Sequence, residues 1–355
     1  MTTSFISIII RSKDEAARLR LTLASLESRP RESEIIVVDD GSSDDTAAVI
    51  SEAGRRQPLE AVRHEAPLGR SAASNAGARR AGGEILLFLD GDTLAGPGLV
   101  SRHAALHAAA RPSRVIGRGE TYHLRCSRMF SDPEMGIPWP ECAGAAAQRP
   151  AGETDRLRVT RAQVLDAFGE IERRAQPGIY PGAGPRRLYE LEMEALVACP
   201  ELDVLWSASS GSNFSVARDD FLAAGGFNEQ IDNNEHRELA LRLFHNGARI
   251  RPVSGGRSYH LTHRSRWRDP LQETAWERVF LAAHPIPAVG LLCVFWSSLS
   301  PATPIAPLYR IDSLLDLDRA ARGDRRLDFD VARRALKLPA LGADFWQGAP
   351  LRAVG

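Results

Sequence analysis

Three short apolar runs, separated by helical patterns, restrict what this chain can fold into more than any other feature of its sequence. They cover residues 4–10, 34–40 and 84–90, and each has the length and apolar content of a strand buried on both faces. Helical patterns lie between them at residues 14–26, 45–53 and 69–81, with a short strand at residues 60–63. Strands joined through helices are parallel and connected by right-handed crossovers. The pattern therefore predicts an α/β fold with a mostly parallel, Rossmann-like sheet flanked by helices.

Polar side chains stand where these strands end. Arg11 follows the first run, Asp39 and Asp40 end the second, and Asp90 with Asp92 ends the third. In open α/β sheets, ligands bind beyond the carboxyl ends of the strands. We therefore expect these five side chains to contribute to one shared site.

The segment LFLDGDT, at residues 87–93, holds two carboxylates separated by one glycine. Neighbouring carboxylates repel each other, so Asp90 and Asp92 favour a cation such as Mn²⁺ or Mg²⁺, which binds carboxylate and phosphate oxygens together. Such a cation could neutralise a diphosphate leaving group, and Gly91 would let the backbone approach a ligand closely. A polar turn after a strand is the alternative explanation, because Asp and Gly are common in turns.

Two further segments carry side chains suited to a nucleotide. Asp39 and Asp40 could accept hydrogen bonds from a base N–H or a ribose hydroxyl, although the serines that follow them are typical of a helix-capping turn. Residues 68–84 form an Ala-rich helical segment whose polar residues Arg70 and Asn75 would face the nucleotide. The alternative for this segment is a helix that only packs against the sheet.

Taken together and in this order, these blocks resemble the family-two glycosyltransferases of the GT-A fold. The resemblance covers residues 4–100 and resumes at residues 211–243, GSNFSVARDDFLAAGGFNEQIDNNEHRELALRL. It implies a nucleoside-diphosphate sugar as donor, a hydroxyl-bearing acceptor, a divalent metal, and inversion of the anomeric carbon by single displacement. It also implies that Asp40 contacts the nucleobase, Asp90 the ribose or donor sugar, and Asp92 the metal.

The resemblance further implies a histidine that completes the metal site beyond the last core strand. Residues 258–265, SYHLTHRS, offer His260 and His263 for this role. We favour His260 because it lies nearer the expected strand end. For either residue, an ordinary surface or capping role is the alternative.

The general base of the family falls where this sequence departs from the family pattern. A Glu-Asp pair is expected at the start of a helix, and the matching positions here are Glu235 and His236. Histidine titrates near neutral pH and is a competent base. Glu235 could serve instead, or Asp232 if the alignment shifts within the preceding loop. Loss of transferase activity is a further alternative.

The order of elements predicts a catalytic domain at residues 1–265 and a helical extension at residues 266–355. Within the catalytic domain, residues 1–110 would bind the nucleotide sugar and residues 211–265 would supply the acceptor and base segment. Residues 111–210 show no resemblance to the family and would form a variable insertion that determines the acceptor.

Inside this insertion, Trp139 and Trp206 are candidate platforms for a sugar ring, because an aromatic face packs against the C–H side of a pyranose. Packing in the core is the alternative for both. Further expected elements are helices at residues 160–174 and 187–198, a loop at 176–185 and a strand at 249–253. A basic run at residues 264–269 could contact a diphosphate or an anionic acceptor, although a solvated helix start is the commoner explanation.

Composition excludes some partners. Lys plus Arg and Asp plus Glu both number 45, so net charge gives no reason to expect nucleic acid. The four cysteines form no C-x-x-C pair, which indicates free thiols in a reducing cytoplasm, and no signal peptide is expected. The apolar residues 288–296 are bracketed by prolines and fall short of the roughly 20 residues of a spanning helix. A buried helix is favoured, with peripheral contact at the inner membrane face as the alternative.

Two other functions compete with glycosyl transfer. A nucleotidyltransferase on a related sheet would need a Gly-rich loop bearing Lys or Arg after the first strand, and residues 11–18, RSKDEAAR, contain no glycine. A protein that binds a nucleotide sugar, or another partner, without turnover stays open because His236 replaces the expected Asp. A coupled assay for released nucleoside diphosphate separates this second function from a transferase.

Overall fold

The computed structural model describes residues 5–150, 152–177, 188–263, 274–300 and 302–347. The chain folds into two compact units, one formed by residues 1–177, 210–229 and 251–267 and the other by residues 178–209, 230–250 and 268–355. The domain boundary expected at residue 265 stays a prediction. Residues 178–185 of the expected loop and the basic run at residues 264–269 lie outside the described residues.

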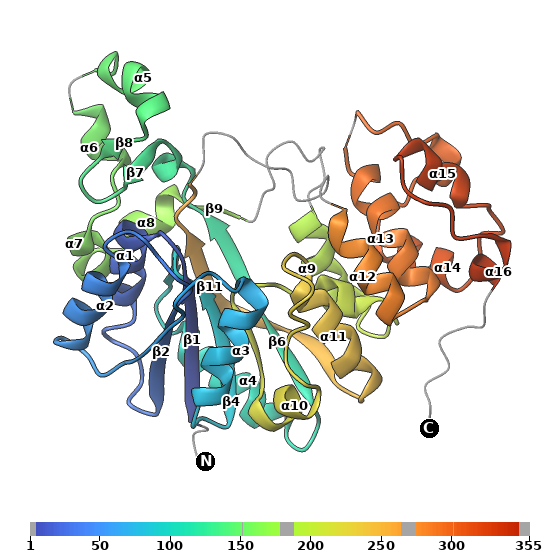
Figure 1. The fold of residues 1–355 in the computed structure, drawn as a ribbon, viewed down its shortest axis with the longest axis horizontal. Coiled ribbons are helices and arrows are strands. Elements are labelled where there is room, and N and C mark those ends of the chain that lie inside the picture. The colour runs from blue at the N-terminus through green and yellow to red at the C-terminus, as the bar shows by residue number, and fades with distance from the viewer. Residues whose placement is uncertain (1–4, 151, 178–187, 264–273, 301, 348–355) are drawn as a thin grey trace. The chain divides into compact units, whose positions relative to one another are not determined.

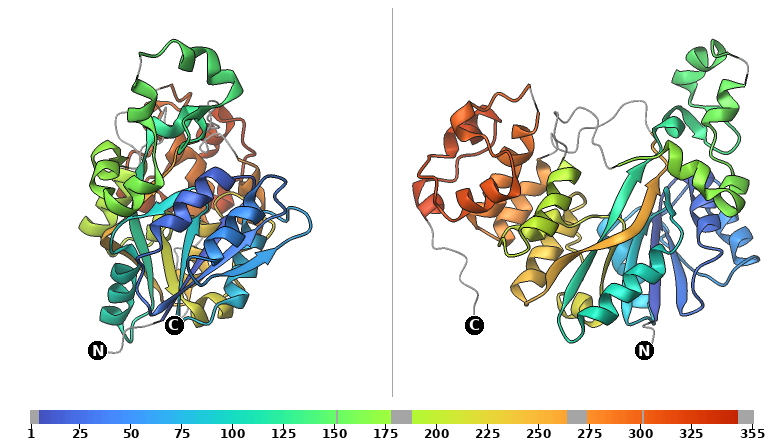
Figure 2. Two further views of the ribbon diagram at one scale, coloured as in Figure 1. Left: turned by 90° about the vertical axis from the view of Figure 1, so that its left-hand side faces the viewer. Right: turned by 180° about the vertical axis from the view of Figure 1, so that it is seen from behind.

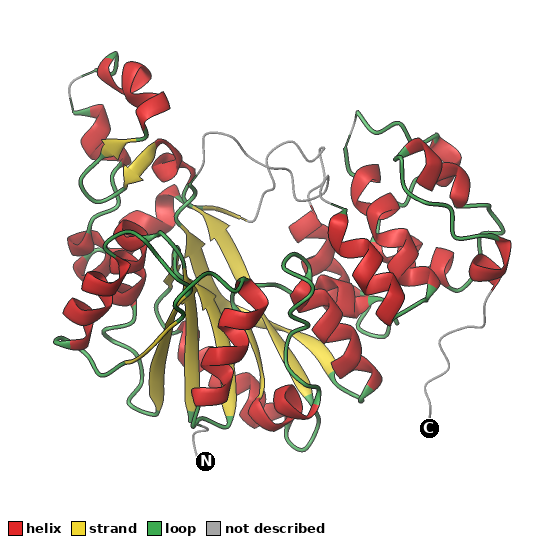
Figure 3. Cartoon of the chain, viewed as in Figure 1, coloured by secondary structure: helices red, strands yellow, loops and turns green. Residues whose placement is uncertain are grey.

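A mixed sheet of nine strands, counted among the described residues, forms the centre of the first unit (Figures 1 and 3). Its order is β3-β2-β1-β4-β10-β6-β11-β5, with β9 beside β6. The strands are β1 Ile6–Ser12, β2 Ser33–Asp39, β3 Glu60–Arg63, β4 Ile85–Asp90, β5 Thr93–Ala95, β6 Val115–His123, β9 Gln176–Pro177, β10 Phe214–Ala217 and β11 Arg249–His260. Neighbours among β3, β2, β1 and β4 are parallel, whereas β10 pairs antiparallel with both β4 and β6. The predicted α/β fold is confirmed.

Helices cover both faces of the parallel half of this sheet, which Figure 2 shows from two further sides. Helices α1 (Ala16–Ser25), α2 (Thr46–Gly54) and α4 (Leu99–Ala110) share one apolar cluster with Ile8 and Ile10 of β1. The residue between them, Ile9, meets α3 (Arg70–Arg80), because successive strand side chains point to opposite faces. The approach is so close that a Cβ on Gly77 of α3 would lie 2.5 Å from Ile9. The small residues of α3 are therefore needed for packing.

One strand is longer than the sequence predicts. The expected strand at residues 249–253 continues as β11 to His260, through Gly255, whose φ is 67°. Glycine inside a strand marks an irregularity without ending it when neighbouring strands hold both edges, and β11 lies between β6 and β5. The extra length carries His260 to the edge of the sheet where the other strand ends meet.

The insertion contributes short elements to the first unit. They are β7 Phe130–Asp132 and β8 Ile137–Pro138, which pair with each other, and helices α5 Ala143–Ala147, α6 Glu153–Leu157, α7 Arg161–Asp166 and α8 Phe168–Arg174. The single helix expected at residues 160–174 is therefore two. The break falls at Ala167, whose φ of −141° and ψ of 42° are not helical. Helix α10 Arg218–Ala223 completes this unit.

The second unit is helical among its described residues, apart from the first residues of β11. Its helices are α9 Leu188–Ala198, α11 Glu235–His245, α12 Ala275–Ala283, α13 Pro287–Ser298, α14 Leu314–Ala321, α15 Asp330–Ala335 and α16 Ala343–Gln347. The apolar residues 288–296 are all buried in α13, which confirms the prediction of a buried helix. Arg333 and Glu277 form a buried ion pair at 2.8 Å between α15 and α12. None of the described helices combines the length and the apolar character needed to cross a membrane.

Candidate active site

The candidate site begins just beyond the carboxyl end of β4, at Asp92. Strand β5 pairs antiparallel with the end of β11, so His260 stands opposite Thr93, and the Leu261 N–H donates to the Asp92 carbonyl at 2.8 Å. This register brings the side chains of Asp92 and His260 together, and His263 reaches the same carboxylate from the loop after β11. Asp92 Oδ2 lies 3.1 Å from Nε2 of His260 and 2.8 Å from Nε2 of His263.

These three side chains fit a metal ion. Their ligand atoms all lie within 4.8 Å of one another. Two ligands that bind one ion at about 2.1 Å and at right angles to each other lie about 3 Å apart. Both contacts of Asp92 match that spacing. The predicted metal residues Asp92, His260 and His263 are therefore brought together, and their role as metal ligands stays a prediction.

In the cluster, the carboxylate and the imidazoles stabilise each other's charged forms. Burial alone would raise the pKa of Asp92, but His260 and His263 hold the pKa of this carboxyl well below its ordinary value. Burial likewise acts to lower the pKa of His260, and the negative charge of Asp92 outweighs it and raises the pKa. A proton or a cation between Asp92 and each imidazole nitrogen removes the repulsion between their lone pairs. The cluster is thus suited to exchanging protons for a metal.

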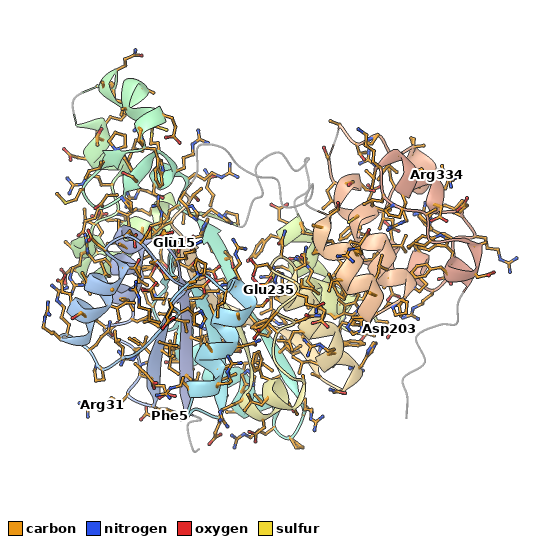
Figure 4. All side chains as sticks on the ribbon, viewed as in Figure 1. Phe5, Glu15, Arg31, Asp203, Glu235 and Arg334 are labelled. Atoms are coloured by element: carbon orange, nitrogen blue, oxygen red, sulfur yellow. The ribbon has the colours of Figure 1, made fainter. Side chains whose placement is uncertain are left out.

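Two residues beside this cluster were not predicted from the sequence. Glu15, labelled in Figure 4, lies just before α1, with Oε1 3.8 Å from His263 Nε2. Burial and the neighbouring Asp92 and Asp90 raise the pKa of Glu15 well above its ordinary value. Arg18 of α1 is buried and donates to the carbonyl of Leu261 at 3.2 Å, which fixes the loop that carries His263. Glu15 follows a strand end, as the predicted residues do, and that position is the signal that could have identified it.

Arg11 and Asp90 form an ion pair beside the cluster. Arg11 Nε lies 2.7 Å from Asp90 Oδ1, and one third of the Asp90 side chain is exposed. A Cβ on Gly91 would lie 2.7 Å from Ser12 Oγ. The close approach of β1 is therefore enough to require glycine at this position, without any contact between its backbone and a ligand. Arg11 therefore orients a carboxylate that can still accept hydrogen bonds from a ligand.

The carboxylates that end β2 organise the loops around them. Asp39 accepts hydrogen bonds from the Ser42 N–H at 2.9 Å and from Arg63 at 2.7 Å. Asp40 accepts from the backbone N–H groups of residues 68 and 69 at 2.8 and 2.9 Å, and it lies 2.7 Å from His64 Nδ1. Asp40 thereby holds the segment that leads into α3. Its contact with a nucleobase stays a prediction.

The two polar residues expected on α3 differ in exposure. Arg70 begins the helix and is exposed. Asn75 is buried, and it accepts from the Phe227 N–H at 2.8 Å and donates to the Phe227 carbonyl and to Glu229 Oε1, both at 2.9 Å. Asn75 thus clamps the Gly-Gly-Phe turn, where Gly226 has a φ of 73°. These contacts support a structural role for Asn75, whereas Arg70 is accessible to a ligand.

The two tryptophans lie in different units. Trp139 follows β8 in the first unit and is half-buried, with the Arg18 guanidinium 5.6 Å from the centre of its ring. Trp206 is 0% exposed in the second unit, and its ring packs against Phe280 at 5.8 Å. Core packing, the alternative given for both residues, is therefore the better supported role for Trp206. Trp139 is the more accessible of the two, and its role as a sugar platform stays a prediction.

The three base candidates lie in the second unit, two in the first turn of α11 and one in the loop before it. Glu235 is buried in the first turn, His236 Nδ1 lies 3.6 Å from Glu235 Oε2, and Asp232 is exposed in the preceding loop. Arg237 lies 2.9 Å from His236 Nε2 and can only donate, so Nε2 is the accepting nitrogen of this ring. The general base stays a prediction among these three residues.

Sequence comparisons point to one family. Residues 7–164 match the family described as Glycosyl transferase family 2. The chain is 30% identical over 250 residues to the validoxylamine A glucosyltransferase of Streptomyces hygroscopicus subsp. limoneus, across 68% of this chain and 48% of that protein. It is 34% identical over 176 residues to the undecaprenyl-phosphate 4-deoxy-4-formamido-L-arabinose transferase of Pseudomonas savastanoi pv. phaseolicola, across 46% and 49% of the two chains. The chain spans about half the length of these relatives.

Solved structures show the same fold. S. aureus TarS superposes with a TM-score of 0.52 at 15% identity, over 93% of this chain and 53% of that one. The structure of TarS 1–349 in complex with UDP-GlcNAc superposes with a TM-score of 0.50 at 15% identity, over 81% and 66% of the two chains. At this identity the likeness concerns the fold alone, and it agrees with the sequence match. The chain therefore belongs to glycosyl transferase family 2.

Proposed function

We propose that the chain transfers a glycosyl group from a nucleoside-diphosphate sugar to an acceptor hydroxyl, with a divalent metal held by Asp92, His260 and His263. The observation that carries the proposal is the cluster itself, in which one carboxylate and two imidazoles converge at the carboxyl edge of the sheet. Ligands of such sheets bind at this edge. The cluster also belongs to the unit that contains the residues matching the family.

The donor atoms of the cluster favour Mn²⁺ over Mg²⁺. Mg²⁺ prefers oxygen ligands and keeps several waters, whereas imidazole nitrogens suit transition metals. A cation bound here would neutralise the diphosphate as it leaves. Asp92 contributes a negative charge in direct contact with both histidines.

The remaining strand ends supply groups for the donor. Asp90, oriented by Arg11, could accept a hydrogen bond from a hydroxyl of the ribose or of the donor sugar. Asp40 uses three hydrogen bonds to hold its loop, and a carboxylate offers about four lone-pair positions. One position would therefore be left for a nucleobase N–H. Exposed Arg70 could approach the diphosphate.

The expected reaction is a single displacement. The acceptor oxygen bonds to the anomeric carbon while the bond from that carbon to the diphosphate oxygen breaks, and a base takes the proton of the acceptor. We assign the base first to His236, with Glu235 and Asp232 as alternatives. Since Nε2 of His236 accepts from Arg237, the ring must leave this contact before Nε2 can take a proton, and this requirement makes Glu235 worth testing beside it.

The test is release of nucleoside diphosphate from a panel of UDP- and GDP-sugars with Mn²⁺ and candidate glycan, lipid or small-molecule acceptors. Turnover that a chelator abolishes is the expected result. His236→Ala should lower turnover roughly 10²–10⁴-fold, the usual contribution of a positioned base. The wild-type rate should fall on the acid side of an apparent pKa between about 5.5 and 7, the range expected for histidine.

Variants on the same helix and its preceding loop locate the base. His245→Ala, at the exposed far end of α11, is the matched control and should keep wild-type turnover. If His236→Ala stays active while Glu235→Gln or Asp232→Asn loses activity, the base is a carboxylate. The His236, Glu235 and Asp232 variants should all keep the wild-type affinity for the donor, because the base acts on the acceptor.

Binding without turnover is the second candidate function. The observation that favours it is His236 at the position where the family has Asp. Thermal stabilisation by a nucleotide sugar and Mn²⁺, with no nucleoside diphosphate released for any acceptor, would support this function over transfer.

A further inference from the structure

A third histidine lies behind the metal cluster, on the side of His260 that faces away from Asp92. His123 is the last residue of β6, and its backbone is fixed by pairing with Gln176 of β9. Its Nδ1 lies 3.1 Å from Nδ1 of His260. The two rings meet edge to face, with centres 5.0 Å apart and planes at 81°. Both nitrogens of His260 are therefore engaged, one by Asp92 and the other by His123.

This contact restricts where the ring proton of His260 can lie. Two imidazole nitrogens at hydrogen-bond distance need one donor and one acceptor. If His123 Nδ1 donates, a neutral His260 carries its proton on Nε2 and cannot bind a metal there. If His123 Nδ1 accepts, the proton of His260 lies on Nδ1, and the lone pair of Nε2 points toward Asp92. The tautomer of His123 thus decides whether His260 is a metal ligand.

We infer that His123 is a positioning residue of the metal site, which accepts the Nδ1–H of His260 and so directs the Nε2 lone pair of His260 at the cation. The inference rests on the proposed metal site. Histidine ligands of metals usually donate their second ring N–H to a fixed acceptor, which sets both tautomer and ring orientation. His123 supplies that acceptor from a neighbouring strand. No local sequence pattern links it to His260, 137 positions away.

The test compares Mn²⁺ affinity, measured by calorimetry on the full chain, among variants that keep or remove the acceptor. His123→Phe keeps a ring of similar size without an acceptor, and His123→Ala removes the ring. His123→Asn places a carbonyl oxygen close to where Nδ1 lies. Phe and Ala should weaken Mn²⁺ binding about 10–100-fold, and Asn should retain it within about threefold, as expected when an outer hydrogen-bond partner orients a ligand. His245→Phe, at an exposed position, is the matched control and should bind as the wild type does.

Each outcome decides something. Unchanged affinity in a folded His123→Phe or His123→Ala protein would overturn the positioning role, and melting curves establish that the variants are folded. Equal losses in the Asn and Phe variants would overturn it too, because packing rather than hydrogen-bond acceptance would then be what matters. Asp92→Ala distinguishes the two levels of the proposal. If it binds Mn²⁺ as the wild type does, or if the wild type binds none, the metal site fails and this inference fails with it.

Discussion

Two groups of histidines lie in the first unit of this protein, one buried and one half-buried, and they differ in the polar groups that they face. The carboxylate cluster consists of Asp92, His260 and His263, and the neutral cluster of His103, His107, Asn213 and Ser215. In the neutral cluster, Ser215 Oγ lies 2.7 Å from His103 Nδ1 and 2.9 Å from His107 Nε2, and Asn213 Oδ1 lies 2.8 Å from His103 Nε2. The hydrogen-bond distances in the two clusters are alike, and their charges are not.

The carboxylate reverses the effect of burial on a histidine. Burial lowers the pKa of His103 and of His107 to about 4. Burial acts on His260 as well, but Asp92 outweighs it and raises the pKa. His103 and His107 also stand four residues apart on α4, a spacing typical of histidine pairs that bind zinc, yet they face a hydroxyl and an amide. Spacing therefore does not identify a metal site until the charge beside the imidazoles is known.

Replacing Asp92 should have the largest effect on this contrast. Among the residues that the structure describes, Asp92 is the one charge that contacts both His260 and His263. Asp92→Ala removes it, so Mn²⁺ affinity should fall more than about 100-fold, beyond the usual loss for an outer-shell residue. Metal-dependent binding of a nucleoside diphosphate should be lost with it. Calorimetry with and without Mn²⁺ measures both effects. His103→Gln, in the neutral cluster, is the control and should bind Mn²⁺ normally; a matching loss there would mean that the two clusters do not act separately.

The next largest effect should be a loss of stability at acid pH, caused by the neutral cluster. The pKa of His103 is about 4 in the folded protein and near 6.5 in the unfolded chain, so the unfolded state binds the proton first as the pH falls. The free energy of unfolding should therefore drop by about 2 kcal/mol between pH 7.5 and pH 5 because of this residue, and the loss should end near pH 4. Urea titrations of the wild type and His103→Gln measure the difference. A variant as acid-sensitive as the wild type would contradict the assignment.

The parallel half of the fold could be predicted from the sequence, because local patterns and tertiary structure agree there. The apolar runs became β1, β2 and β4, and the short strand at residues 60–63 is β3. Most of the insertion could not be predicted, because its short helices are set by capping and tertiary contacts, although α9 (Leu188–Ala198) matches the helix expected at residues 187–198. The capping box formed by Thr160 and Gln163, for example, starts α7, yet the apolar pattern continues through the break at Ala167.

The candidate site divides in the same way. Residues 90 and 92 could be predicted because a buried strand delivers them, and His260 and His263 because a family resemblance pointed to them. His123 had no such signal, since its partner is far away in the sequence. Glu15 follows the end of β1, a position that could have identified it, and its contact with His263 is visible only in the structure. Asn75 and Trp206 carry side chains suited to ligands, and only the structure reveals that other protein groups occupy them.

A smaller effect on Mn²⁺ affinity should separate the two histidines of the proposed metal site. His260 is fixed by pairing between β11 and β5, whereas His263 lies on the loop after β11, with Glu15 3.8 Å away. A carboxylate at that distance can move toward the ion and replace a lost imidazole. His263→Ala should therefore weaken Mn²⁺ binding only about tenfold, less than His260→Ala does. The double variant Glu15→Gln/His263→Ala tests the replacement, and an affinity equal to that of His263→Ala alone would rule it out.

The smallest effect concerns the hydroxyl that the neutral cluster has in place of a carboxylate. Ser215→Ala removes the group that contacts both His103 and His107 and leaves two buried ring nitrogens without it. Losing such a hydrogen bond costs about 1–2 kcal/mol, and the smaller side chain adds no steric clash. Urea unfolding should show this loss at pH 7.5, whereas Ser51→Ala, at an exposed position on α2, should not. Mn²⁺ affinity should stay at the wild-type value, because Ser215 acts on stability alone. Weaker Mn²⁺ binding with unchanged stability would mean that the neutral cluster also supports the metal site, and the contrast between the two clusters would then fail.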